Sequence, residues 1–235
     1  MWSYYGSKSK IIDLYPSPKF DKIIEPFAGS ARYALKYFDR DVLLVDKYPV
    51  IVKIWKWLQQ ASEKDIADLP HKMKETDRVS NYNLCEGASL LMGFLIAGAS
   101  QAPRDKPTRR TVVFRPNSIN YRLNSIQKNL FKIRHWKIVE GSYKDIENKD
   151  ATWFIDPPYQ EGGYVYVENN KGWDYKELAE WCRSRKGQII VCENTSATWM
   201  DFSPMREMRG NIYSTTEAIW SNYPHNFTAK QQELF

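Results

Sequence analysis

The chain has 235 residues, of which 43% are hydrophobic and 26% charged, and its net charge is +6. This length fits one α/β domain with an insertion or two small domains, and the basic balance favours a polyanionic partner such as nucleic acid. The three cysteines are scattered, which excludes a disulfide framework and a cysteine metal site. The start has no apolar signal segment, and the longest apolar run, Ala88 to Ala99, is too short to span a membrane. We therefore expect a cytoplasmic protein with no metal and no membrane contact.

Short apolar runs that end in turn-forming residues predict parallel strands, and helical patterns lie between several of them. The predicted strands are Lys22–Phe27, Val42–Asp46, Trp136–Glu140, Ala151–Asp156, Gln188–Glu193, Met205–Arg209 and Glu217–Trp220. The predicted helices are Ser30–Phe38, Val50–Gln60, Tyr121–Ile133 and Tyr175–Arg185. This alternation predicts an α/β fold, a doubly wound and mostly parallel sheet.

One segment interrupts the alternation, so we predict a main domain of residues 1–60 and 121–235 with an insertion at 61–120. The insertion begins with a charged helix, continues with a buried helix near Leu84–Ala99, and then reads "QAPRDKPTRRTVVFRPNS", in which "TVVF" suggests one arm of a hairpin. Five basic residues and one acidic residue concentrate the positive excess of the chain here, which favours contact with phosphates over a plain solvated loop. The basic residues are Arg104, Lys106, Arg109, Arg110 and Arg115.

Three predicted strands end in residues that suit a ligand site, because α/β sheets bind ligands at the carboxyl ends of their strands. The first ends in "EPFAGSA", where Gly29 allows close approach of the backbone. The second ends in Asp46, which either binds ribose hydroxyls or caps the helix that Pro49 begins. The third ends in "DPPY", Asp156 to Tyr159, whose two prolines predict a stiff, extended corner.

Together, "YYGSK", "EPFAGSA" and "DPPY" resemble the motifs of DNA adenine-N6 methyltransferases of the Dam type, in the same order along the chain. The resemblance implies a Rossmann-like class I methyltransferase fold with an inserted DNA-recognition region, and S-adenosylmethionine as the methyl donor. It also implies double-stranded DNA as the partner, and a bacterial or phage setting such as a restriction–modification system. Carried over by position, the implied cofactor-binding residues are Tyr4, Tyr5, Gly6, Lys8, Phe27, Gly29, Asp46, Ser142, Tyr143 and Asp156. Two positions depart from the family pattern, Ser7 and Ala31, and they put cofactor affinity in question.

The "DPPY" corner would then carry the chemistry. The carboxylate of Asp156 and the backbone carbonyl of Pro157 can accept the two N–H bonds of an exocyclic amine, and the carboxylate stabilises positive charge that develops on the nitrogen. Tyr159 offers a face for the base, and Pro158 helps to keep the corner rigid, because catalysis of this kind depends on positioning. The base has to leave the duplex to reach such a site, and the basic insertion is suited to compensate for that step.

Other functions stay open. Methylation of cytosine N4 uses the same chemistry, although Asp156 favours adenine; an RNA substrate and a DNA-binding relative without activity are further alternatives. Methylation of cytosine C5 needs a cysteine nucleophile, for which the chain has no suitable candidate. The C-terminal residues from Gln231 to Phe235 resemble the short peptides that dock on bacterial sliding clamps, although a frayed tail is the simpler interpretation.

Overall fold

A computed structural model describes residues 2, 4, 6–98, 100–162, 172–209 and 214–224. Tyr5 and residues 231–235 lie outside this part of the chain, so the cofactor role of Tyr5 and the clamp-binding tail stay predictions. All three cysteines are free thiols, as the sequence predicts.

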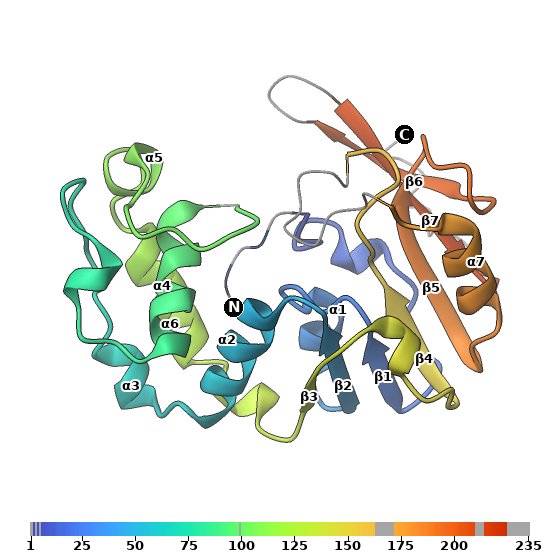
Figure 1. Cartoon of the computed structure of the whole chain (residues 1–235), viewed down its shortest axis with the longest axis horizontal. Coiled ribbons are helices and arrows are strands. Elements are labelled where there is room, and N and C mark those ends of the chain that lie inside the picture. The colour runs from blue at the N-terminus through green and yellow to red at the C-terminus, as the bar shows by residue number, and fades with distance from the viewer. Residues whose placement is uncertain are drawn as a thin grey trace.

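The centre of the molecule is a seven-stranded sheet with the order β3-β2-β1-β4-β5-β7-β6 (Figure 1). The strands are β1 (Lys22–Glu25), β2 (Asp41–Asp46), β3 (Lys137–Glu140), β4 (Ala151–Ile155), β5 (Gly187–Asn194), β6 (Ser203–Arg209) and β7 (Ser214–Ser221). Each of the predicted strands is present, and β1, β2, β3, β4 and β5 pair in parallel. The strand order and the mostly parallel pairing confirm the predicted fold class, an α/β fold with a doubly wound, mostly parallel sheet.

The predicted parallel direction is wrong for β7, which runs antiparallel to both β5 and β6. Only four residues separate the end of β6 from the start of β7. A parallel pair needs a crossover of a dozen residues or more, so a connection this short permits only an antiparallel pair.

Side chains that alternate along the strands fill two cores, one on each face of the sheet. Ile23 of β1 belongs to the core that α1 (Arg32–Lys36) and α2 (Pro49–Gln60) cover, whereas Ile24 belongs to the core under α7 (Tyr175–Arg183). Helix α1 is shorter than the predicted Ser30–Phe38, because the chain has a left-handed conformation at Ala31 and the helix begins after it.

A lobe of helices lies beside the sheet, on the left of Figure 1. It contains α3 (Glu63–Ala67), α4 (Glu86–Ala97), α5 (Arg109–Val112) and α6 (Ser118–Gln127); short 3-10 helices occur at Ile12–Leu14, Val79–Asn81, Leu130–Ile133 and Tyr143–Asp145. The predicted helix Tyr121–Ile133 is thus two elements, α6 and a 3-10 turn. Helix α4 is the predicted buried helix, and it packs directly on α2: a Cβ on Gly87 would lie 2.3 Å from the Cβ of Trp57. Among the described residues, no helix has both the length and the hydropathy to cross a bilayer.

The hairpin suggested for "TVVF" is wrong. Thr111 and Val112 complete the short helix α5, and Val113 and Phe114 follow it as exposed residues. The strand preference of Val and Phe reflects packing against a neighbouring strand, and the sheet pairs none of its strands with this segment.

Candidate active site

A cavity of about 560 Å³ opens at the carboxyl ends of β1, β2 and β4. This is the place at which α/β sheets bind ligands, and its size suits a small-molecule cofactor. Ten residues predicted from the sequence line it together: Tyr4, Gly6, Lys8, Phe27, Gly29, Asp46, Ser142, Tyr143, Asp156 and Pro158. Pro157 and Tyr159 are not among the lining residues.

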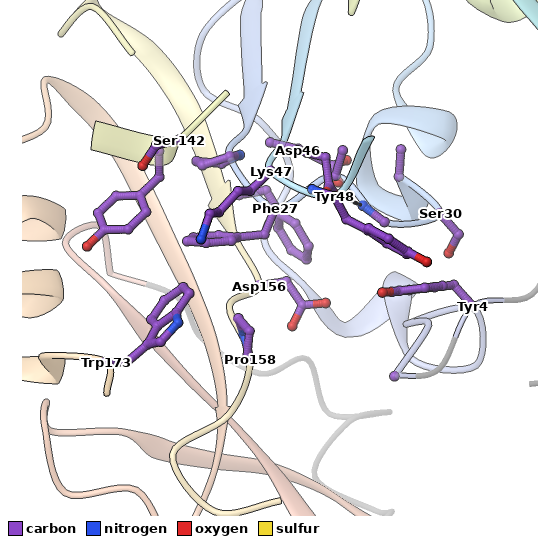
Figure 2. A pocket seen from close by; sticks show the side chains of 18 of the residues that line it. Tyr4, Phe27, Ser30, Asp46, Lys47, Tyr48, Ser142, Asp156, Pro158 and Trp173 are labelled. Atoms are coloured by element: carbon purple, nitrogen blue, oxygen red, sulfur yellow. Dashed lines mark hydrogen bonds between the residues drawn. The ribbon is translucent and has the colours of Figure 1, made fainter. Parts of the chain in front are cut away.

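Asp156 lies at the centre of the cavity, as Figure 2 shows. Tyr4 and Tyr48 lie on one side of it in this view, and Phe27 and Trp173 lie on the other. The cavity therefore extends to both sides of the carboxylate.

Three aromatic rings form one wall of the cavity. The ring centroid of Phe27 lies 5.4 Å from that of Tyr143 and 5.6 Å from that of Trp173, and the rings of Tyr143 and Trp173 are stacked at 5.9 Å. These rings come from three separate parts of the chain: the end of β1, the turn after β3 and the loop before α7. Such a wall is suited to a flat heterocycle, because aromatic rings stack favourably with offset partners.

The turn after β1 has a backbone that only small residues permit. Gly29 has φ +44°, and a Cβ there would lie 3.2 Å from Cδ1 of Tyr4. Ala31 has φ +45°, a conformation that costs an L residue about 1–2 kcal/mol. The resemblance places a glycine at position 31, so the left-handed conformation there is compatible with the family pattern even though the residue is Ala.

Both oxygens of the Asp46 carboxylate accept hydrogen bonds from backbone amides. Oδ2 accepts from the N–H of Gly29 at 2.9 Å, and Oδ1 accepts from the N–H of Tyr48 at 2.9 Å. The N-cap residue of α2 is Tyr48. Asp46 thus fixes the turn after β1 against the end of β2, and its role toward a ribose stays a prediction.

Asp156 is paired with a lysine from the N-terminal segment. Nζ of Lys8 lies 2.7 Å from Oδ1 of Asp156, and the Lys8 side chain is only 6% exposed. Burial raises the pKa of Asp156, and the Lys8 ammonium opposes part of that rise. The carboxylate therefore faces the cavity with one oxygen already engaged by a cation.

Tyr159 turns its hydroxyl away from the cavity. The hydroxyl donates to Oε1 of Glu217 on β7 at 2.5 Å, and Nζ of Lys8 lies 4.7 Å from the centroid of the Tyr159 ring. Burial raises the pKa of Tyr159 well above its usual range, with further contributions from Glu217 and Asp156. The proposed contact of the ring with a base stays a prediction.

The corner that follows β4 is held by contacts from neighbouring elements. The buried carboxylate of Glu193, at the end of β5, accepts from the N–H of Gln160 at 2.6 Å and from Nε1 of Trp199 at 3.1 Å. The hydroxyl of Tyr175 donates to the carbonyl of Pro158 at 2.8 Å. These bonds, together with the two prolines, fix the position of Asp156.

A second acid, Glu25, lines the cavity although it is only 2% exposed. One of its oxygens accepts from the N–H of Ala34 at 2.6 Å. Burial raises the pKa of Glu25 to about 8, although the bond from Ala34 opposes the rise. Glu25 is thus largely protonated at neutral pH and can donate or accept a hydrogen bond inside the cavity.

The N-terminal segment is fastened to the turn after β1 by polar contacts. Nε of Arg32 and Oγ of Ser30 each lie 3.0 Å from Oγ of Ser7, and the guanidinium of Arg32 also donates to the carbonyl of Trp2. The ring of Trp2 is fully buried against Trp55. This anchoring places Tyr4, Gly6 and Lys8 over the cavity.

Sequence reasoning missed several lining residues, including Glu25, Arg32, Lys47, Tyr48 and Trp173. Lys47 and Tyr48 directly follow Asp46, so their place after a strand end was a usable signal. Arg32 lies within a predicted helix and Trp173 in a loop, and neither position carries a motif.

The five basic residues predicted to contact DNA do not line this cavity. Arg104, Lys106, Arg109, Arg110 and Arg115 are all exposed on the helical lobe. Within the lobe, Nη1 of Arg78 pairs with Asp105 at 2.8 Å, and Arg109 lies 3.7 Å from Glu75. Arg78 thus matches the acidic residue of the segment, and Glu75 offsets the charge of Arg109, so the segment and its two partners together keep a positive excess.

No protein-family model matches the chain, and no curated protein is similar to it in sequence. Among solved structures, it is similar to a putative methyltransferase, yhhF, from Escherichia coli, at 10% identity and a TM-score of 0.35, over 90% of this chain and 78% of that one. It is also similar to the rRNA methyltransferase aviRa from Streptomyces viridochromogenes, at 10% identity and a TM-score of 0.40, over 91% and 81% of the two chains.

Proposed function

We propose that the protein is an S-adenosylmethionine-dependent methyltransferase that modifies N6 of adenine in double-stranded DNA. The observation that carries the proposal is the placement of Asp156. Its carboxylate follows directly after β4 and opens into a cavity that has an aromatic wall on one side and the N-terminal segment on the other. The resemblance of the motifs implies this reaction, and the cavity has room for a cofactor beside Asp156.

The residues that line the cavity fit S-adenosylmethionine in size and chemistry. The rings of Phe27, Tyr143 and Trp173 would hold the adenine, and the carboxylate of Asp46 would bind the ribose. Gly29 leaves the space that a side chain would fill, and Tyr4 covers it. When bound, the cofactor supplies an electrophilic methyl group on a sulfonium.

The chain's own contribution to the reaction is to position and activate the target amine. The nitrogen is a poor nucleophile because its lone pair is delocalised into the ring. Asp156 and the carbonyl of Pro157 would accept its two N–H bonds, which frees the lone pair for in-line attack and stabilises the developing positive charge. Because Lys8 already engages Oδ1 of Asp156, the amine would use Oδ2 or share the carboxylate with the lysine.

The surface of the helical lobe is suited to bind DNA. Its exposed arginines occur together with apolar side chains that are unusually open to solvent: Phe114 is 72% exposed and Val113 46%, and Tyr121 near Arg115 is 76% exposed. The guanidinium of Arg109 lies 6.0 Å from the centroid of the Phe114 ring. Arginines can neutralise phosphates, and exposed rings offer contact to bases or sugars.

The direct test is to incubate the protein with S-adenosylmethionine and unmethylated genomic DNA, digest the DNA to nucleosides and analyse them by mass spectrometry. N6-methyladenine is the expected product. N4-methylcytosine would keep the mechanism and overturn the choice of base. If no methylated base forms, parallel reactions with RNA and calorimetry with the cofactor separate an RNA substrate from an inactive DNA-binding relative, which should give little or no heat.

We further propose that residues 231–235 dock on a bacterial sliding clamp, on the basis of the sequence "QQELF" alone. A synthetic peptide of residues 228–235 should bind a purified clamp. Absence of binding at tens of micromolar peptide would refute this partner without affecting the proposed reaction.

A further inference from the structure

Asp156 belongs to a buried cluster of charged groups that also contains Lys8 and Glu217. The proposed mechanism assigns no role to Glu217. Nζ of Lys8 lies 2.7 Å from Oδ1 of Asp156 and 3.4 Å from Oε1 of Glu217. Lys8 and Glu217 are 6% and 8% exposed. One ammonium is thus shared between two carboxylates.

Glu217 is held in its place by two tyrosines. The hydroxyls of Tyr15 and Tyr159 donate to its Oε1 at 2.6 and 2.5 Å. Tyr15 is 3% exposed, and burial raises the pKa of both phenols well above the usual range, so both remain neutral donors. Oε1 of Glu217 thus accepts from two hydroxyls and also lies beside the Lys8 ammonium.

Two carboxylates and one ammonium together carry one net negative charge. Glu217 does not line the cavity, so it cannot contact a ligand directly, but its charge acts on the cavity through a buried region in which screening by solvent is weak. Asp156 and Lys8, which do line the cavity, connect the cluster to any ligand bound there.

We propose that Glu217 is a specificity-determining residue: its charge makes the Asp156 end of the cavity favour a positively charged methyl donor over the neutral thioether that remains after transfer. The inference rests on the proposed function, because it names the preference of the same cavity between donor and product. It adds a consequence for turnover, since weaker binding of the neutral product eases its exchange for fresh donor.

The test compares the dissociation constants of S-adenosylmethionine and S-adenosylhomocysteine by calorimetry, in the wild type and in Glu217→Gln. Gln keeps the size of the side chain and an oxygen that can accept from both tyrosines, and removes only the charge. In Glu217→Gln, the affinity for S-adenosylmethionine relative to that for S-adenosylhomocysteine should be about 4- to 15-fold lower than in the wild type. This is the effect of a unit charge acting over roughly 10 Å at an effective dielectric constant of about 20 to 40. The charge of Glu217 also raises the pKa of Asp156, so the ratio of the two dissociation constants is measured in both proteins over a range of pH, and a change in the ionisation of Asp156 shows as a pH dependence of the difference.

Two further variants separate charge from packing. Tyr15→Phe removes one hydrogen bond to the same carboxylate without changing its charge, so the ratio should stay at the wild-type value. Lys8→Gln removes the cation, so the affinity for S-adenosylmethionine relative to that for S-adenosylhomocysteine should rise. This variant provides the test if Glu217→Gln does not fold. An unchanged ratio in a folded Glu217→Gln, or a shift of equal size in Tyr15→Phe, would overturn the inference while leaving the proposed function intact. A wild type that binds neither ligand would instead overturn the proposed function, and the inference with it.

Discussion

Lys8 and Asp156 are 148 residues apart in the sequence, yet Nζ of one lies 2.7 Å from Oδ1 of the other. The pair joins the N-terminal segment to the corner after β4, and both residues line the same cavity. The cation lowers the cost of burying the acid, which would otherwise favour its protonated form. The motifs "YYGSK" and "DPPY", which lie far apart in the sequence, therefore act as one unit.

Replacing Asp156 with Asn should abolish turnover, whereas it should weaken binding of S-adenosylmethionine only through the loss of one negative charge at the cavity. The amide keeps the size of the side chain but cannot stabilise the positive charge that develops on the amine, so we expect kcat to fall by roughly 100-fold or more. Methylation rates and calorimetry with S-adenosylmethionine measure the two effects separately. Asp201→Asn, which changes an exposed carboxylate, is the matched control. Retained turnover in Asp156→Asn would refute the proposed role.

Glu25 should make the protein less stable as the pH rises. The folded state raises the pKa of this carboxyl from 4.5 to about 8, so it holds the proton more tightly than the unfolded chain does. The resulting stabilisation is fully present below pH 4.5 and is lost as the pH rises to about 8; its size is on the order of 3–5 kcal/mol.

Urea unfolding of the wild type and of Glu25→Gln between pH 5 and 9 measures this contribution. The Gln side chain stays neutral throughout, so the wild type should lose stability relative to the variant as the pH rises. Other buried carboxyls, such as Asp156 and Glu193, titrate in both proteins and cancel from the difference. Parallel stability curves would show that Glu25 is ionised in the folded protein at neutral pH.

Gly29→Ala should weaken cofactor binding as well as stability. The positive φ strains an Ala by about 1–2 kcal/mol, and the new Cβ would push against the Tyr4 ring that covers the cavity. Gly98→Ala is the matched control, because Gly98 also has a positive φ, +81°, but a Cβ there meets nothing within 4 Å. Thermal unfolding should show a loss in both variants, whereas calorimetry should show weaker S-adenosylmethionine binding only in Gly29→Ala. Equal S-adenosylmethionine affinity in the two variants would show that Tyr4 does not contact the bound cofactor.

The sheet could be predicted because its signals are local. Apolar runs such as Ala151–Ile155 end in turn-forming residues, and each predicted strand is present. The pattern of a single strand does not predict the reversed direction of β7, because that direction depends on the length of the connection to β6. Val113 and Phe114 misled the prediction for a related reason: their strand preference applies only where a partner strand packs beside them.

The part of the site that follows strand ends could be predicted for the same reason, since Asp46 and Asp156 each terminate a strand. The contacts that depend on tertiary structure could not. Glu217 lies within β7, far along the chain from Tyr15 and Tyr159, and no local pattern shows that their hydroxyls meet on its carboxylate. Trp173 joins the aromatic wall only because the loop before α7 brings it to Phe27.

Reversing the charges of Arg109 and Arg110 should identify the surface that contacts DNA. Both side chains are exposed on the helical lobe, and each phosphate contact adds about one unit to the slope of log affinity against log salt concentration. The double variant Arg109→Glu/Arg110→Glu should therefore bind a duplex more weakly and show a slope that is smaller by about two. Fluorescence anisotropy with a labelled duplex over a series of salt concentrations measures both quantities.

The matched control is Lys176→Glu/Arg183→Glu, which reverses two exposed charges on α7, at the opposite end of the molecule from α5 in Figure 1. It changes the net charge of the protein by the same amount, so it separates a local contact from a general electrostatic effect. If the control lowers the slope as much as the α5 variant does, the basic segment is not the DNA surface and the attraction comes from the charge of the whole molecule. If only the α5 variant lowers it, the phosphates lie against the helical lobe.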